Sequence, residues 1–303
     1  MKNVLVLYYS QSGQLQSVMD QIVAPLLQCD AVQCDYRKIE PETPYPYPWP
    51  FYKFFNVFPE AVYLDGCPVK QLKLKKDYDL IILGYTSWFL SPSIPVTGFL
   101  KSDQAKKLFK NKPVVTVIAC RDMWLIAQEK MKGLLEDLGA RLIDNVVLTD
   151  QGKSLYTFVT TPRWMLTGKK DAFWFFPPAG VYEQEIESTS RFGDRLCKAL
   201  QHDEERGTLP LLSNMGAVTV NGKLIATEHI AHRSFLIWSK LIKKAGAPDS
   251  KGRNVVITLY AIFLLTLILT VVPLNMLIRW LLSPFRKKSL AKAIDYYEQP
   301  SGK

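Results

Sequence analysis

The chain begins with an unbroken run of β-branched, aliphatic and aromatic residues that ends in a short loop of small polar residues. Residues 4–9 read VLVLYY, which predicts a strand buried on both faces of a parallel sheet. The loop and the start of the next segment are Ser10, Gln11, Ser12, Gly13, Gln14 and Leu15. Hydroxyl groups, a glycine that lets the backbone come close and the free N–H groups of a following helix are together suited to holding a phosphate.

The order of these loop residues excludes two common phosphate-binding motifs. The loop contains neither G-x-G-x-x-G nor G-x-x-x-x-G-K-[ST]. Its pattern of hydroxyl, any residue, hydroxyl and glycine resembles that of the flavodoxin family, which holds the terminal phosphate of FMN there. Ser10, Ser12 and Gly13 match, whereas Leu15 replaces a residue that usually carries a hydroxyl. The resemblance therefore implies FMN, and the hydroxyl that Leu15 does not offer to the phosphate is either missing or supplied by Ser17.

Further strand-like segments follow in the order of a doubly wound sheet. A strand is predicted near residues 31–37, and apolar runs predict strands at residues 79–84, 114–119 and 146–148. Residues 187–200 have the periodicity of an amphipathic closing helix. We therefore predict an α/β fold over residues 1–202, a flavodoxin-like, doubly wound, parallel five-stranded sheet. Insertions are expected at about residues 41–76 and 151–180.

The loops after the predicted strands 79–84 and 114–119 complete the predicted cofactor site. A doubly wound sheet binds its ligand at the carboxyl ends of several strands. Flavodoxin-like quinone and FMN reductases carry similar loops around the flavin ring. The resemblance assigns cofactor contacts to Thr86, Ser87, Trp88, Phe89 and Cys120.

Three residues near the expected ring edge are candidates for acid, base or electrostatic catalysis. Arg121 could stabilise an anionic flavin or enolate, and Tyr85 or Asp122 could move a proton. The alternative is that each is a solvated loop residue. With bound FMN, the hydride chemistry would belong to the cofactor.

A long uncharged segment lies near the end of the chain. Residues 254–278 contain no charge and lie between Arg253 and Arg279, and about 20 apolar residues suffice to span a bilayer as a helix. Residues 251–303 are therefore predicted to be a hydrophobic membrane-anchor helix with a basic tail that emerges opposite or returns as a re-entrant segment. Both flanks are basic, so the positive-inside rule sets no orientation. A flavin domain needs cytosolic reductant, which places residues 1–250 on the cytoplasmic side of the inner membrane.

Two insertions are rich in aromatic residues. Residues 44–55 alternate prolines with aromatics, and residues 161–182 include Trp164 and the run 173–176, FWFF. Such residues collect at membrane interfaces and around apolar ligands. They indicate an apolar entrance facing lipid, with ordinary core packing as the alternative.

Residues 203–250 are predicted to form a connector. Residues 217–226 predict a β-hairpin with a primed turn at Asn221-Gly222, and residues 228–244 a basic, partly apolar surface helix. His229 and His232 lack further ligands nearby, so we expect no metal site. The five cysteines are odd in number and lack C-x-x-C spacing, which favours reduced thiols.

The charge of the chain excludes other classes of function. A formal charge of +10 and a pI near 9.2 are opposite to the acidic surface of a soluble flavodoxin that docks basic partners. The sequence has no arginine-rich run, RNA-binding aromatic signature or zinc spacing, so nucleic acid is not an expected partner.

The N-terminal loop, the proline and aromatic insertion, residues 173–181 (FWFFPPAGV) and the hydrophobic anchor together resemble the bacterial dialkylresorcinol condensing enzyme family of dialkylresorcinol and flexirubin biosynthesis. The resemblance implies a lipophilic cyclic dione or quinone substrate, membrane lipid and a ketosynthase as partners. No ketosynthase-type Cys-His-His set is evident, so oxidative aromatisation of a cyclohexanedione is favoured over condensation. One alternative is an NAD(P)H:quinone reductase, and another is a non-catalytic electron carrier or membrane scaffold.

Overall fold

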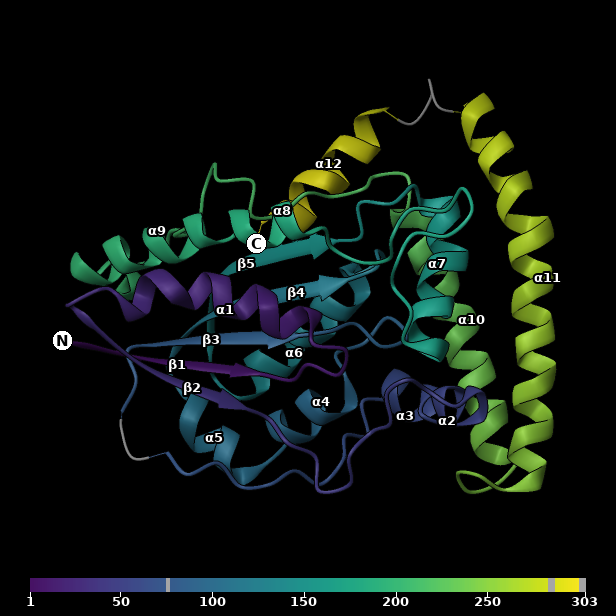
Figure 1. Cartoon of the computed structure of the whole chain (residues 1–303), viewed down its shortest axis with the longest axis horizontal. Coiled ribbons are helices and arrows are strands. Elements are labelled where there is room, and N and C mark those ends of the chain that lie inside the picture. The colour runs from purple at the N-terminus through teal and green to yellow at the C-terminus, as the bar shows by residue number, and fades with distance from the viewer. Residues whose placement is uncertain (75–76, 283–286, 300–303) are drawn as a thin grey trace.

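A parallel sheet forms the centre of the protein (Figure 1). The computed structural model describes residues 1–74, 77–282 and 287–299, and within them the sheet has five strands in the order β2-β1-β3-β4-β5. The strands are β1 (Lys2–Tyr8), β2 (Val32–Lys38), β3 (Leu80–Tyr85), β4 (Pro113–Cys120) and β5 (Arg141–Thr149). This is the flavodoxin-like strand order, in which the direction of winding reverses between β1 and β3. The predicted fold class is therefore confirmed.

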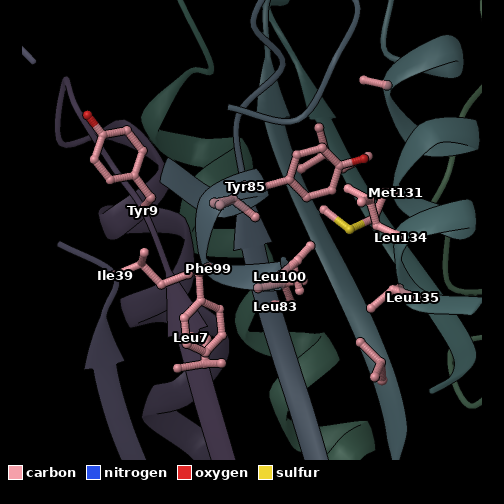
Figure 2. Packing of buried hydrophobic residues seen from close by; sticks show 14 of the residues in the cluster. Leu7, Tyr9, Ile39, Leu83, Tyr85, Phe99, Leu100, Met131, Leu134 and Leu135 are labelled. Atoms are coloured by element: carbon pink, nitrogen blue, oxygen red, sulfur yellow. The ribbon is translucent and has the colours of Figure 1, made fainter. Parts of the chain in front are cut away.

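Helices cover both faces of this sheet. On one face lie α1 (Gln14–Leu27), α8 (Glu183–Ser188) and α9 (Ser190–Gln201). On the other lie α4 (Ile94–Leu100), α5 (Asp103–Phe109) and α6 (Leu125–Asp137). The alternation of β1 explains this arrangement, because Val4 and Val6 face α1 while Leu5 and Leu7 face the opposite core. Figure 2 shows Leu7, Leu83 and Phe99 in that second core.

The contact between α1 and α9 is unusually close and contains a disulfide. A Cβ atom on Gly193 would lie 2.1 Å from the carbonyl oxygen of Ile22, so only glycine fits there without a shift. A few residues on, Cys197 is disulfide-bonded to Cys29 with a Cα–Cα distance of 6.3 Å. The expectation that all the cysteines are reduced is therefore wrong. The two partners are 168 residues apart in sequence, so their spacing could not reveal the pair.

The proline and aromatic insertion forms two short helices, α2 (Phe51–Asn56) and α3 (Phe58–Val62). These helices share a core with the last part of the chain. Phe58 stacks on Tyr260 with ring centroids 4.8 Å apart, and Ile242 and Ile257 are fully buried in the same cluster. The insertion thus packs against the segments predicted as connector and anchor.

The predicted β-hairpin at residues 217–226 is wrong. Residues 217–220 lie beside β5, where Val147 donates its N–H to the carbonyl oxygen of Ala217 at 2.8 Å. The side chain of Asn221 then accepts a hydrogen bond from the N–H of Lys223 at 3.2 Å, and the turn leads into α10 (Ile225–Lys244). Asn-Gly here starts a helix rather than joining two strands, because the segment that follows has helical periodicity.

The last three helices wrap around the carboxyl end of the sheet (Figure 1). After α10 the chain reverses into α11 (Lys251–Leu282), and α12 (Lys287–Glu298) then returns to the domain. By length and composition, residues 251–270 could cross a membrane. Arg286, part of the predicted basic flank, and residues 300–303 of the predicted tail lie outside the described residues.

Candidate functional site

A pocket opens at the carboxyl ends of β1, β3 and β4. Its lining comes from the loops after β1, β3 and β4, from the residue after β5 and from the two insertions. The lining residues are Gln11, Ser12, Gln14, Leu15, Phe54, Thr86, Ser87, Trp88, Phe89, Ala119, Cys120, Arg121, Asp150, Thr161, Trp164, Met165 and Gly180. The predicted cofactor residues other than Ser10 and Gly13 are therefore brought together here.

The loop after β1 presents the start of α1 to this pocket. Gly13 is the N-cap residue, has a φ of 88° and provides no side-chain cap. The hydroxyl of Ser10, which is buried, accepts a hydrogen bond from the N–H of Gln16 at 3.3 Å. A Cβ atom on Gly13 would meet no atom within 4 Å. The left-handed backbone therefore requires glycine and the space beside it is open, as at a helix N-terminus that binds an anion.

Two glutamine side chains of this loop have structural partners. Gln11 donates to the carbonyl oxygen of Pro46 at 2.7 Å and accepts from the indole N–H of Trp49 at 3.0 Å. Gln14 donates to the carbonyl oxygen of Val181 at 3.3 Å. The first insertion is thereby attached to one side of the loop, and the segment after the second insertion to the other.

The loop after β3 contains a buried hydroxyl without a partner. Trp88 and Ser91 exchange two backbone hydrogen bonds, of 2.8 and 3.1 Å, and Phe89 between them has a φ of 50°. Within the described part of the chain, the Oγ1 atoms of Thr86 and Thr161, both in the pocket lining, are buried and have no hydrogen-bond partner. Buried polar groups are normally paired, so these two atoms are available to bond a polar ligand in the pocket.

The charged groups of the pocket follow β4 and β5. Arg121 donates from Nε to the hydroxyl of Thr157 at 2.8 Å, and its guanidinium lies 4.1 Å from the ring centroid of Phe158. Asp150 accepts from the N–H groups of Gly152 and Gly180 at 2.7 and 2.6 Å.

Burial shifts the titration of these groups in the direction that disfavours charge. It lowers the pKa of Arg121 and raises the pKa of both Cys120 and Asp150. A pocket of this kind strengthens the interaction of its remaining charges with a bound ligand, because water screens them poorly.

Two of the three predicted catalytic residues do not line the pocket. Tyr85 is fully buried and donates to Oε1 of Gln128 at 2.6 Å, and Figure 2 shows its ring beside Met131 in the core. Asp122 accepts from the backbone N–H of Met123 at 2.9 Å. Arg121 alone of the predicted catalytic set faces the pocket.

Part of the pocket was missed by sequence reasoning. Asp150, Thr161, Met165 and Gly180 come from the end of β5, from α7 (Ser154–Thr167) and from the segment after it. Trp164, an aromatic residue of the second insertion, also lines the pocket, although its sequence context assigns it no place in the site. The position of Asp150 directly after an apolar strand was the available signal.

The histidines of α10 lie away from this pocket. His229 contacts the hydroxyl of Tyr297 through Nε2 at 3.0 Å. Across the residues with described positions, no group of three or more His, Cys, Asp or Glu side chains could hold a metal ion.

The chain matches no protein-family model and no curated protein. It is similar to solved structures at low identity. A flavoprotein in complex with FMN from Lactobacillus acidophilus NCFM is 18% identical, with 48% of this chain and 93% of that chain covered and a TM-score of 0.40. A flavodoxin, WrbA-like protein from Agrobacterium tumefaciens is 10% identical, with 67% and 99% covered and a TM-score of 0.38.

The class of the protein follows from its own topology. The strand order β2-β1-β3-β4-β5, all parallel, defines a flavodoxin-like α/β protein. Its pocket lies beside the point between β1 and β3 where the winding reverses, which is where such sheets bind ligands.

Proposed function

We propose that this chain is a membrane-associated, FMN-dependent oxidoreductase that acts on a lipophilic cyclic dione or quinone. The observation that carries the proposal is the pocket itself. It combines the glycine-capped start of α1, the unpartnered hydroxyls of Thr86 and Thr161, and apolar walls, at the reversal point of a flavodoxin-like sheet. These features fit a ligand with an anionic end, polar edges and a flat apolar body.

The residues divide into groups that suit the parts of FMN. The first turn of α1 and the hydroxyl of Ser12 would hold the phosphate, while Leu15 would offer only its backbone N–H because its side chain is buried in the core. Thr86 and Thr161 would hydrogen-bond polar atoms, with Trp88 beside the ring. Bound FMN would supply hydride transfer.

The walls of the pocket support a lipophilic substrate. Phe54 and Met165 line it from the two insertions. For oxidative aromatisation, a cyclohexanedione would lose a hydride from one ring carbon and a proton from its neighbour. Arg121 would stabilise the enolate charge, and Asp150 is the carboxylate in the lining that could accept the proton. The product would be a resorcinol, whose aromaticity favours the reaction.

The first test is the absorbance spectrum and the released cofactor of protein purified in mild detergent. Stoichiometric FMN is expected. Colourless protein that also fails to bind added FMN would contradict the proposal and favour a scaffold role.

The substrate is tested separately with flavin-loaded protein. A 2,5-dialkylcyclohexane-1,3-dione should be converted to the resorcinol, with removal of two hydrogen atoms seen by mass spectrometry. Conversion should fall at least tenfold in Arg121→Met protein with full flavin occupancy. Rapid NAD(P)H-dependent quinone reduction without dione oxidation would instead identify a quinone reductase.

A further inference from the structure

The first end of α11 is attached to the sheet domain through α2 and α3. Arg253, in the first turn of α11, is buried and donates to Oε2 of Glu60 at 2.6 Å. Just before the helix, Asp249 forms an ion pair with Lys53 at 2.5 Å. This end of α11 is therefore fixed to the proline and aromatic insertion of the domain.

The chain beyond the other end of α11 is attached to the same domain. In α12, Tyr296 donates to Oε2 of Glu129 at 2.9 Å, and its ring lies 5.0 Å from the ammonium of Lys132. Glu129 and Lys132 belong to α6, which covers the sheet. Figure 1 shows α11 running along the side of the domain between these two attachments.

The outer face of α11 is apolar and exposed. Its exposed aliphatic residues include Val255, Leu259, Ile262 and Leu269, of which 60%, 55%, 58% and 67% of the surface is accessible. Their spacing of four, three and seven residues places them on one side of the helix. No charged residue occurs from 254 to 278. Exposure of such an apolar face to water is unfavourable, and a face of this kind is normally covered by an apolar partner.

Exposed basic residues lie at the start of α11 and on the helices before and after it. Lys240 and Lys244 at the end of α10, Lys251 at the start of α11 and Lys292 on α12 are all exposed. Lysines beside an apolar helix face match the anionic headgroups of a bilayer surface.

A perpendicular crossing is incompatible with both attachments. A helix that spans the ~30 Å hydrocarbon core places its two ends on opposite sides of the bilayer. Glu60 pairs with the start of α11, and Glu129 accepts a hydrogen bond from α12, the helix after it. Both carboxylates belong to one domain, which would then have to extend across the hydrocarbon region.

From these contacts we infer that α11 lies in the plane of one leaflet of an anionic membrane, with both of its ends and the whole domain on the same side. The outer face of α11 enters the lipid, and the exposed lysines of α10, α11 and α12 contact the headgroups. The pocket, at the carboxyl end of the sheet, is thereby held close to the bilayer. This inference does not depend on FMN and is tested without it.

Topology is tested with single cysteines in full-length protein whose Cys34, Cys67 and Cys120 are replaced by serine. Ala247→Cys before α11, Gln299→Cys after α12 and Glu136→Cys in the domain are all at exposed positions. A membrane-impermeant maleimide is applied to spheroplasts and to inside-out vesicles of a bacterial host. All three cysteines should react from the same side. Reaction of Gln299→Cys from the side opposite to Glu136→Cys would show a crossing helix and overturn the inference.

The lipid contact is tested by vesicle flotation. Leu259→Lys/Ile262→Lys should lower the bound fraction on phosphatidylcholine–phosphatidylglycerol vesicles at least tenfold. The control Leu27→Lys/Leu209→Lys changes residues that are also exposed, by 66% and 79%, and should bind like the parent. Parent protein should bind several-fold less to phosphatidylcholine alone. If the α11 variant binds vesicles normally but no longer forms a dimer in detergent, the face is covered by a second copy and the inference is wrong.

Discussion

Arg253 of α11 and Glu60 of α3 form an ion pair of 2.6 Å in which the arginine side chain retains only 2% of its exposure and the glutamate 24%. The same guanidinium donates to the carbonyl oxygen of Asn56 at 2.5 Å, while its Nε has no partner among the described residues. The pair therefore joins the hydrophobic helix to the first insertion, and it does so with one donor unsatisfied.

Removing Glu60 should destabilise the protein more than removing an exposed carboxylate. Glu60→Ala leaves the buried guanidinium without its counter-charge, and we expect a destabilisation of about 2 kcal/mol, less than the ~3–5 kcal/mol of a fully buried pair. The matched control is Glu40→Ala, which breaks the exposed pair with Lys70. Thermal unfolding in mild detergent should show a lower Tm only for Glu60→Ala, and equal values would contradict the role assigned to the pair.

Gly193 should be required for the packing of α9 on α1. Alanine there would place a Cβ atom 2.1 Å from the carbonyl oxygen of Ile22, and forcing the helices apart should cost about 2 kcal/mol. In Gly133→Ala the new Cβ meets nothing within 4 Å, so this helical control should gain about 0.5–1 kcal/mol. Denaturant unfolding of the two variants measures both effects. If Gly193→Ala leaves the free energy of unfolding unchanged, the two helices can separate at little cost.

Glu228 should make stability depend on pH. Burial is the main cause that raises its pKa from 4.5 to about 8 in the folded protein. Between these two values the folded state binds more protons than the unfolded state, so stability should fall as pH rises, by up to about 1.4 kcal/mol per pH unit. Glu228→Gln keeps an acceptor for the N–H of Ile126, which Glu228 contacts at 2.7 Å.

The measurement for Glu228 is Tm from pH 5 to pH 8 in both proteins. The Tm of the parent should fall more steeply than that of Glu228→Gln over this range. Parallel curves would mean that Glu228 titrates near its ordinary value in the folded protein.

The side chain of Thr86 should lower the stability of the flavin-free protein and strengthen the binding of FMN. Because its buried Oγ1 has no partner, Thr86→Val should leave the stability of the flavin-free protein unchanged or raise it by about 1 kcal/mol, and should weaken FMN affinity roughly fivefold, or about 1 kcal/mol. Tm without flavin and fluorescence titration with FMN test the two parts. Unchanged affinity would remove Thr86 from the site.

The central strands could be predicted because their local sequence and their burial agree. Apart from Asp79, Gly84 and Thr116, the runs 4–9, 79–84 and 114–119 consist of aliphatic and aromatic residues, as expected of strands covered on both faces. The prediction of a hairpin turn at Asn221-Gly222 was wrong because local sequence and tertiary context disagree there. The same dipeptide serves a hairpin or a helix start, and the flanking segments decide which one forms.

Local sequence was enough to predict the succession of strands, the loop after β1, the aromatic insertions and the uncharged segment of α11, because each depends on residues close together in the chain. The contacts between residues far apart in the chain follow instead from the three-dimensional packing. This packing places Asp150 and Thr161 in the pocket and Tyr85 in the core, pairs Cys29 with Cys197, and attaches the start of α11 and the following helix α12 to one domain. Such contacts join residues far apart in the chain, so periodicity and local composition cannot predict them.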